Sequence, residues 1–142
     1  MALPEWLRFA RLLTAPRRAG SAGIVAAQRV GRDYPCGLFC YRVDQDLQCG
    51  KVLMAEHFVA VDLLDPTAVL DALVAELEGL AQSLGCGAVR SVVHGGEVGV
   101  TGGLAAAGLS PEGQLLQKSL IEEAKPRTRR LKRPSASASP PA

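Results

Sequence analysis

Long hydrophobic runs are missing from this sequence, and so is the leader of a secreted protein. No stretch approaches the roughly 20 consecutive apolar residues that cross a bilayer, so we expect no membrane partner. The N-terminus carries arginines but lacks the apolar segment of about 7–15 residues and the cleavage site of a signal peptide. These absences predict a cytoplasmic protein.

Paired metal-ligand motifs are also lacking, although the chain has four cysteines. The spacing of Cys36, Cys40 and Cys49 does not match paired C-x2-C knuckles, and no histidine is near enough in sequence to complete a zinc set. Thiols in the cytosol stay reduced. We therefore expect buried or strand cysteines, including Cys86, and no metal site.

Positive charge is scarce in the middle of the chain. Residues 1–20 hold four arginines against Glu5, and residues 122–142 hold six basic residues against two glutamates, so the ends carry +3 and +4. The net charge of +2 then leaves −5 for the middle, which disfavours nucleic-acid binding there. The basic run Lys125–Arg133 could contact nucleic acid, but no aromatic residue is interleaved to stack bases.

The length of 142 residues fits one domain, since typical domains hold about 100–150 residues. We expect a globular domain over residues 23–121 and a basic disordered tail over 122–142, where prolines, serines and like charges oppose packing. Residues 1–22 predict a short helix or arm. An Arg-rich targeting peptide is the alternative there, although Glu5 weakens it.

Turn residues divide the domain into strands and helices. Three β-rich segments separated by turns predict antiparallel strands over Ile24–Val30, Gly37–Val43 and Val52–Val61. Asp65-Pro66 then predicts a helix start, because Asp is a preferred N-cap and Pro is favoured at the first helical position. Apolar residues continue at helical spacing to Leu84, and Gly85 predicts a left-handed cap.

The next apolar segment, Cys86–Val93, predicts a strand parallel to Val52–Val61, because a strand, a helix and a strand form a right-handed crossover. A glycine-rich connector follows, then a short helical patch at Leu104–Ala107 and a last strand at Gln114–Ile121. The predicted fold class is α/β (α+β), with a mixed sheet and a central long helix. The connector's glycines could expose backbone donors to an anion, but a P-loop lysine is missing.

Two segments of the sequence resemble the GNAT superfamily of N-acetyltransferases. Residues 77–90, Leu-Glu-Gly-Leu-Ala-Gln-Ser-Leu-Gly-Cys-Gly-Ala-Val-Arg, are similar to the family's long helix and the strand after it. Residues 106–113, Ala-Ala-Gly-Leu-Ser-Pro-Glu-Gly, are similar to the segment after its last helix. The resemblance covers about residues 23–121. It implies a GNAT-like domain truncated at the N-terminus, and acyl-CoA-dependent transfer to an amine.

The resemblance also exposes missing parts. The family's Arg/Gln-x-x-Gly-x-Gly/Ala loop, which holds the pyrophosphate of acetyl-CoA, corresponds to Leu64–Asp71, which has neither glycine nor arginine. Pro66 removes a donor, and the carboxylates of Asp65 and Asp71 repel a polyphosphate. We therefore expect acetyl-CoA, or another acyl-CoA, to bind weakly or not at all. The family's usual proton-donating tyrosine falls on Leu104.

Three side chains are candidates for the chemistry. Glu56 and His57 lie on the strand where the resemblance implies a carboxylate base. Because they are neighbours on a strand, we expect their side chains to point to opposite faces of the sheet. His94 ends the parallel strand beside a Gly-Gly, where α/β sheets open onto ligand crevices. The resemblance further implies that the backbone of Val59 and Val61 binds the pantetheine.

Two functions are compatible with the sequence. The first is a divergent N-acyltransferase with Glu56 and His94 as catalytic candidates. The second is a non-catalytic GNAT-like module that binds an unknown protein partner or forms a homodimer, because a fold does not fix a function. Titration with acetyl-CoA separates them.

Overall fold

The computed structural model describes residues 2–62, 64–95, 97 and 99–120. The chain divides into two units, Met1–Pro111 and Glu112–Ala142. The first unit holds, in chain order, α1 (Leu3–Leu13), a 3-10 turn (Pro16–Arg18), β1 (Ala22–Gln28), β2 (Pro35–Asp46), β3 (Gly50–Ala60), α2 (Pro66–Ser83), β4 (Ala88–Val92) and α3 (Val100–Ala106).

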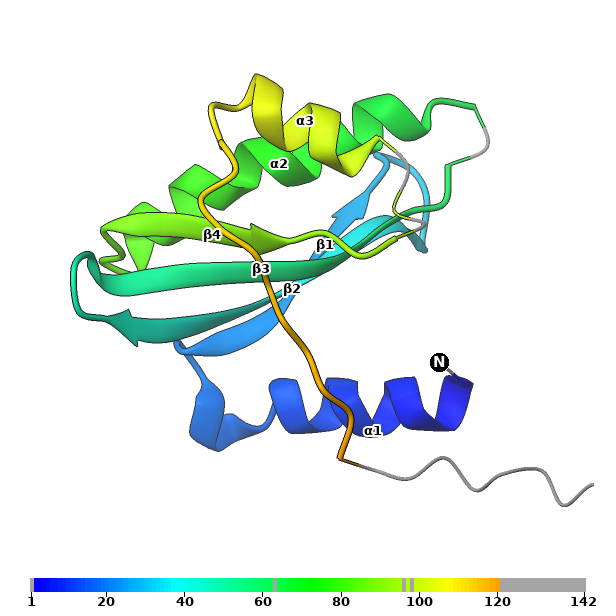
Figure 1. Ribbon diagram of the computed structural model, residues 1–142. Helices are drawn as coiled ribbons and strands as arrows, with labels where there is room; N and C mark the ends of the chain where they lie inside the picture. The colour runs from blue at the N-terminus through cyan, green and yellow to red at the C-terminus, as the bar shows by residue number, and fades with distance from the viewer. Residues whose placement is uncertain (1, 63, 96, 98, 121–142) are drawn as a thin grey trace, which may run out of the picture. The chain divides into compact units, whose positions relative to one another are not determined.

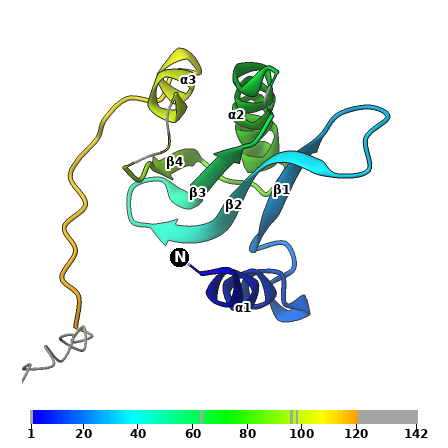
Figure 2. The ribbon, with the colours of Figure 1, turned by 90° about the vertical axis from the view of Figure 1, so that its right-hand side faces the viewer.

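The four strands form one sheet in the order β1-β2-β3-β4. The first three strands are antiparallel neighbours, and β4 runs parallel to β3 after the α2 crossover. Helices α2 and α3 lie on one face of the sheet and α1 lies on the other (Figure 1, Figure 2). The predicted α+β fold with a mixed sheet is confirmed.

The main core lies between the sheet and α2. Phe39 of β2 and Phe58 of β3 stack with ring centroids 5.3 Å apart, and Leu73 and Leu77 of α2 are almost fully buried beside them. A Cβ at Gly37 would lie 2.5 Å from the Val69 side chain. Only glycine fits at this close approach of β2 to α2.

A smaller core joins α1 to the opposite face of the sheet. Leu13 of α1 is buried with Ala22 and Cys40, and Trp6 and Phe9 pack against them. These three α1 side chains recur at helical spacing on one face, which explains why the segment packs as a helix. The observation fits the short-helix interpretation of the N-terminal segment.

Helix α2 begins and ends at the residues that the sequence indicated. The Asp65 carboxylate accepts the Ala68 N–H at 3.0 Å, and Pro66 occupies the first turn. At the other end Gly85 has φ +70°, and the Cys86 N–H donates to the Ala81 carbonyl at 2.8 Å. This pattern is a Schellman motif, so the predicted left-handed cap is confirmed.

Replacing Asp65 with Ala should therefore lower the free energy of unfolding by about 1 kcal/mol, because one donor of the first turn loses its acceptor. Urea unfolding monitored by circular dichroism measures the difference. Asp65→Asn is the matched control, since its amide oxygen still accepts the hydrogen bond and should preserve stability. Equal stability of the Ala variant and the wild type would show that the cap contributes nothing.

The last predicted strand, Gln114–Ile121, is wrong over its described part. Residues 114–120 contain neither strand nor helix, and Leu115 and Leu116 are 72% and 88% exposed. An apolar segment forms a strand only where a neighbouring strand supplies hydrogen-bond partners. Helix α3 is also longer than the helical patch predicted at Leu104–Ala107, since α3 begins at Val100. Ile121 and the predicted disordered tail over 122–142 lie outside the described residues.

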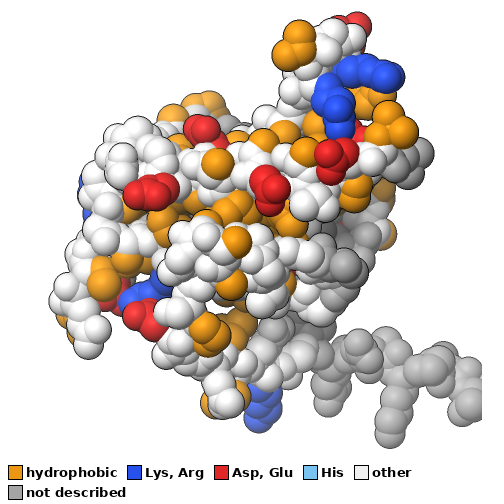
Figure 3. All heavy atoms as spheres, turned by 90° about the horizontal axis from the view of Figure 1, so that it is seen from above, with side chains coloured by type: hydrophobic (Ala, Val, Ile, Leu, Met, Phe, Trp, Pro, Cys, Tyr) orange, Lys and Arg blue, Asp and Glu red, His pale blue; other side chains and the backbone are white. Residues whose placement is uncertain are grey.

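In the part of the chain that the structure describes, no helix is long and apolar enough to cross a bilayer. The face over α2 and α3 shows acidic side chains interspersed with hydrophobic ones, and basic side chains gather at one end of it (Figure 3). Asp71, Glu76 and Glu78 of α2 are exposed. The exposed surface of α2 is therefore poorly suited to a polyanion.

Candidate functional site

A β-bulge interrupts β3 at its middle. Glu56 pairs with Cys40 and Val59 pairs with Leu38, so His57 and Phe58 together oppose one residue of β2. His57 has φ +59°, which is unusual for a residue other than glycine. The extra residue changes which side chains face which side of the sheet beyond this point.

The bulge places Glu56 and His57 on the same face of the sheet. Glu56 pairs with Arg42, and His57 contacts Phe9 of α1, whereas the next residue, Phe58, enters the α2 core. The expectation that Glu56 and His57 point to opposite faces is therefore wrong. Strict alternation holds only in a regular strand, and the left-handed residue breaks it.

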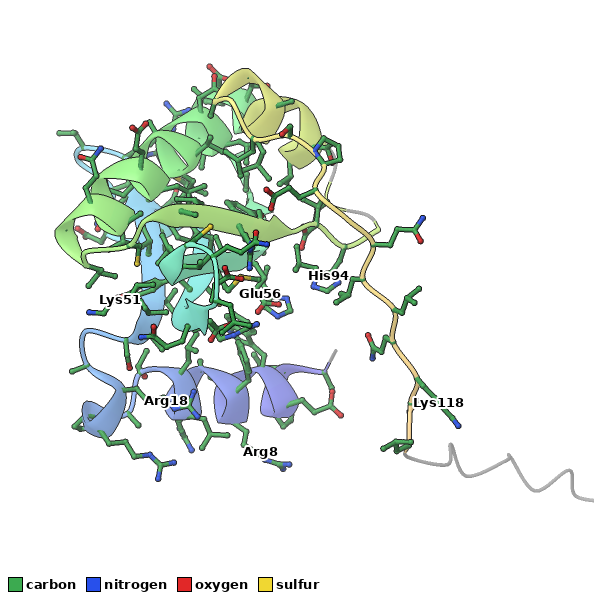
Figure 4. All side chains as sticks on the ribbon, turned by 60° about the vertical axis from the view of Figure 1, so that its left-hand side comes forward. Arg8, Arg18, Lys51, Glu56, His94 and Lys118 are labelled. Atoms are coloured by element: carbon green, nitrogen blue, oxygen red, sulfur yellow. The ribbon has the colours of Figure 1, made fainter. Side chains whose placement is uncertain are left out.

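His94 reaches the same place from the end of β4. Its imidazole stacks on that of His57, with centroids 5.1 Å apart and an interplanar angle of 14°. One donor atom from each of Glu56, His57 and His94 lies within 4.8 Å of the others. Figure 4 shows Glu56 and His94 side by side. The sequence identified all three residues but not their convergence.

The cluster lies where β3 and β4 separate. Their parallel pairing runs from Val52 and Ala88 to Glu56 and Val92, and β4 ends there. The remaining residues of β3 continue to Ala60 without a β4 partner. The end of the pairing thus leaves a strand edge beside the three side chains.

Backbone groups of Phe58 and Ala60 face this edge. The Val61 N–H donates to the Cys36 carbonyl of β2 at 2.8 Å, and alternate residues direct their backbone groups to opposite edges. The backbone groups of Val59 and Val61 therefore face β2, while those of Phe58 and Ala60 face the edge of β3 beyond the end of β4. The side chains of Val59 and Val61 are 43% and 61% exposed.

Charged groups on β2 surround Glu56. Its carboxylate forms an ion pair with Arg42, whose Nε also donates to Asp44 at 3.0 Å. The neighbouring Cys40 is buried, and burial, with a contribution from the Glu56 charge, raises the pKa of its thiol to about 11. Cys40 therefore stays protonated at neutral pH and is a poor nucleophile.

Phe9 of α1 covers one side of the cluster, and sequence reasoning missed it. Its ring meets the His57 ring edge-on at 5.4 Å and 76°, and Trp6 lies 5.7 Å from Phe9. The sequence predicted a short helix or arm in this segment, but not that it would contact a candidate residue. The aromatic contact holds the His57 ring in place.

A second ion pair ties β4 to the β2–β3 hairpin. Asp46 accepts the Cys49 and Gln48 N–H groups and a hydrogen bond from Arg90 at 2.7 Å. These hydrogen bonds, that of the Cys49 N–H first, lower the pKa of Asp46 from its ordinary 3.8 to about 2. The ionised carboxylate is thus favoured in the folded state.

The pKa of Asp46 is lower in the folded protein than in the unfolded chain. The ionised carboxylate therefore stabilises the fold above its ordinary pKa, and this stabilisation is lost as the pH falls through the folded-state pKa. Asp46→Asn should therefore be less stable than the wild type above about pH 4, and the difference should shrink toward about pH 2. Urea unfolding across this range measures it. A difference that persists unchanged at the acidic end would contradict the assigned cause.

The segment before α2 is closed by its own hydrogen bonds. Asp62 accepts the Leu64 and Asp65 N–H groups and pairs with Arg29. The Leu64 N–H, followed by Arg29, lowers the pKa of Asp62. Asp65 caps the helix, so two carboxylates lie at its start. A groove of about 450 Å³ nearby is lined by Arg29, Arg32, Tyr34, Cys36, Val61, Asp62 and Leu64.

The position that resembles a family proton donor is closed as well. Leu104 of α3 is 4% exposed and belongs to the main core. Val100 and Gly103 pack α3 near Leu70 of α2, so the C-terminal part of the glycine-rich stretch is helix and not an open anion loop. Gly96 and Val98 of that stretch lie outside the described residues.

No protein-family model matches the sequence, and no curated protein matches it. Several solved structures do match the fold of this chain. A probable acetyltransferase aligns at 14% identity over 87% of this chain and 81% of its own, with a TM-score of 0.65. Glucosamine-6-phosphate N-acetyltransferase from Arabidopsis thaliana aligns at 15% identity over 83% and 76%, with a TM-score of 0.61. The aminoglycoside N-acetyltransferase AAC(6')-Iy in complex with CoA aligns at 16% identity over 82% of this chain and 91% of its own, with a TM-score of 0.58.

Proposed function

We propose that this chain, whose fold is similar to that of N-acetyltransferases, is a divergent acyl-CoA-dependent N-acyltransferase. The observation that carries the proposal is the convergence of Glu56, His57 and His94 beside the strand edge where β3 and β4 separate. Amine acylation needs a base within hydrogen-bond reach of the acceptor and groups that hold the donor. The cluster offers the base, and the unpaired edge of β3 offers backbone groups for the donor.

His94 is the residue best placed to accept the proton. It is exposed, so a solvent-borne amine can reach it, whereas Glu56 is half-buried and held by Arg42. The Glu56 carboxylate stabilises the imidazolium that forms. The neutral amine attacks the thioester carbonyl while His94 accepts one proton from its nitrogen, so that a C–N bond forms and the C–S bond breaks. The CoA thiolate leaves and takes a proton from solvent, because Leu104 offers none, and the His94 imidazolium returns its proton to solvent.

The acyl donor would be held mainly by the strand edge. Phe58 and Ala60 present backbone groups there, which suit the amides of a pantetheine arm. The start of α2 suits a pyrophosphate poorly, because Asp65 already accepts the Ala68 N–H and Asp62 adds a second carboxylate. The donor therefore binds weakly, and the pyrophosphate contributes little.

Amine-dependent release of CoA tests the proposal. Purified chain is incubated with millimolar acetyl-CoA and a panel of primary amines, and free thiol is measured against a protein-free control. The proposal expects at least one amine to accelerate thiol release. If every amine leaves the rate at that of the control while acetyl-CoA binds, the transferase function is wrong.

A second candidate is the non-catalytic module that binds a protein or a second copy of this chain. The internally capped start of α2 favours it, because that end of the helix needs no ligand. Sedimentation of the free protein as a dimer, together with complete absence of acetyl-CoA binding at millimolar concentration, would support this candidate over the enzyme.

A further inference from the structure

The same three side chains form a donor set that the proton-transfer role does not exhaust. We infer that Glu56, His57 and His94 bind a divalent transition-metal ion, with Zn²⁺ the best suited, through one carboxylate oxygen and two imidazole nitrogens. Two histidines and one carboxylate with a remaining open position are a donor set of zinc and of non-haem iron sites. The inference does not depend on the transferase function.

The three donor groups are gathered but not yet set around an ion, because the His57 and His94 rings are stacked at 14° and a metal must lie in the plane of each ring. The three donor atoms lie within 4.8 Å of one another, whereas Zn–N bonds of about 2.0–2.1 Å place tetrahedral donors about 3.4 Å apart. Rotation of the His94 side chain can close the gap, because it is exposed and follows the end of β4. Three protein ligands then leave a fourth position for water.

The backbone at His57 also marks this place as a site. A non-glycine residue in the left-handed region costs on the order of 1–3 kcal/mol, and such residues cluster at ligand and active sites. Here φ +59° at His57 has a definite result, since it turns the imidazole to the face that Glu56 and His94 share. Phe9 packs edge-on against the ring and holds it there.

The surrounding charges permit a cation. Arg42 pairs with one oxygen of Glu56, which leaves the second oxygen for the metal, and Asp44 offsets the arginine charge. Cys40, the nearby thiol, is buried and does not belong to the cluster, so the donor set is nitrogen and oxygen without thiolate. A bound ion would occupy the groups assigned to proton transfer, and Zn²⁺ should therefore inhibit acyl transfer.

Titration with the metal alone tests the inference. Calorimetry of the full chain with Zn²⁺ should give one site per chain, and Co²⁺ should give absorption bands without the near-ultraviolet band of a thiolate ligand. His94→Ala and Glu56→Gln should weaken binding by at least about 100-fold, more than the loss of an outer partner costs. His57→Gly should weaken Zn²⁺ binding to the same extent. Because glycine adopts the positive φ of this position without strain, loss of folding cannot explain its effect.

Cys49→Ser is the matched control, because Cys49 is an exposed thiol that should not contribute. Binding that survives in all three cluster variants, or that is lost in Cys49→Ser, would overturn the inference. Absence of Zn²⁺ binding to the wild type would also overturn it. The thiol-release assay is run on the wild-type chain without added metal, so failure of the metal site and failure of the proposed function are distinguishable.

Discussion

Replacement of His94 with Gln should lower the rate of amine acylation by about 10²–10⁴-fold, the usual contribution of a positioned general base. The effect should appear in kcat, with little change in the KM for acetyl-CoA, because the proposed donor contacts are backbone groups of Phe58 and Ala60. Glutamine keeps the size and hydrogen bonding of the side chain but cannot accept a proton at neutral pH. Steady-state thiol release at saturating amine measures the change.

Gln82→Ala is the control for this experiment, since Gln82 lies on the exposed face of α2 and contacts Glu78. Its turnover should equal that of the wild type. Glu56→Gln should also lower kcat, because the imidazolium at His94 loses its stabilising carboxylate. Undiminished turnover in the His94 variant would remove His94 from the mechanism and leave Glu56 as the remaining candidate base.

Acetyl-CoA should bind the unaltered chain with a Kd of about 1 mM or weaker. A pyrophosphate that loses two charge-assisted hydrogen bonds, at about 1.5–3 kcal/mol each, loses roughly 10²–10⁴-fold in affinity. The start of α2 has this deficit, because Asp65 takes the Ala68 N–H and Pro66 has none to give. Calorimetry at millimolar ligand measures the affinity.

Asp65→Asn separates the two parts of this argument. The amide keeps the cap but removes the negative charge, so affinity should rise by about 2- to 5-fold, corresponding to the roughly 0.3–1 kcal/mol of a charge at a helix terminus. Micromolar binding by the wild type would contradict the prediction. Unchanged affinity in Asp65→Asn would show that the phosphates do not approach the start of α2.

The long helix could be predicted because its signals are local. Asp65, Pro66 and Gly85 act within one turn of the helix ends, and the structure has α2 at Pro66–Ser83. The parallel relation of β3 and β4 followed from the crossover rule, which depends only on element order. These features require no knowledge of distant contacts.

The convergence of the candidate residues could not be predicted in the same way. The bulge at His57 depends on how β2 and β3 pair, since Cys40 and Leu38 set the register on either side of it. No glycine marks the left-handed residue, and alternation from Glu56 then gave the wrong face for His57. The predicted strand at 114–121 shows the same limit, because strand formation depends on a partner elsewhere in the chain.

The proposed function places the acyl donor along the edge of β3 beside His94. Chemical-shift mapping of isotope-labelled protein titrated with millimolar acetyl-CoA tests this placement. We expect the largest amide shifts at Phe58, Ala60 and His94, with small shifts at Ala68. Shifts confined to the groove residues Arg29 and Arg32, or no shifts at the β3 edge, would contradict it.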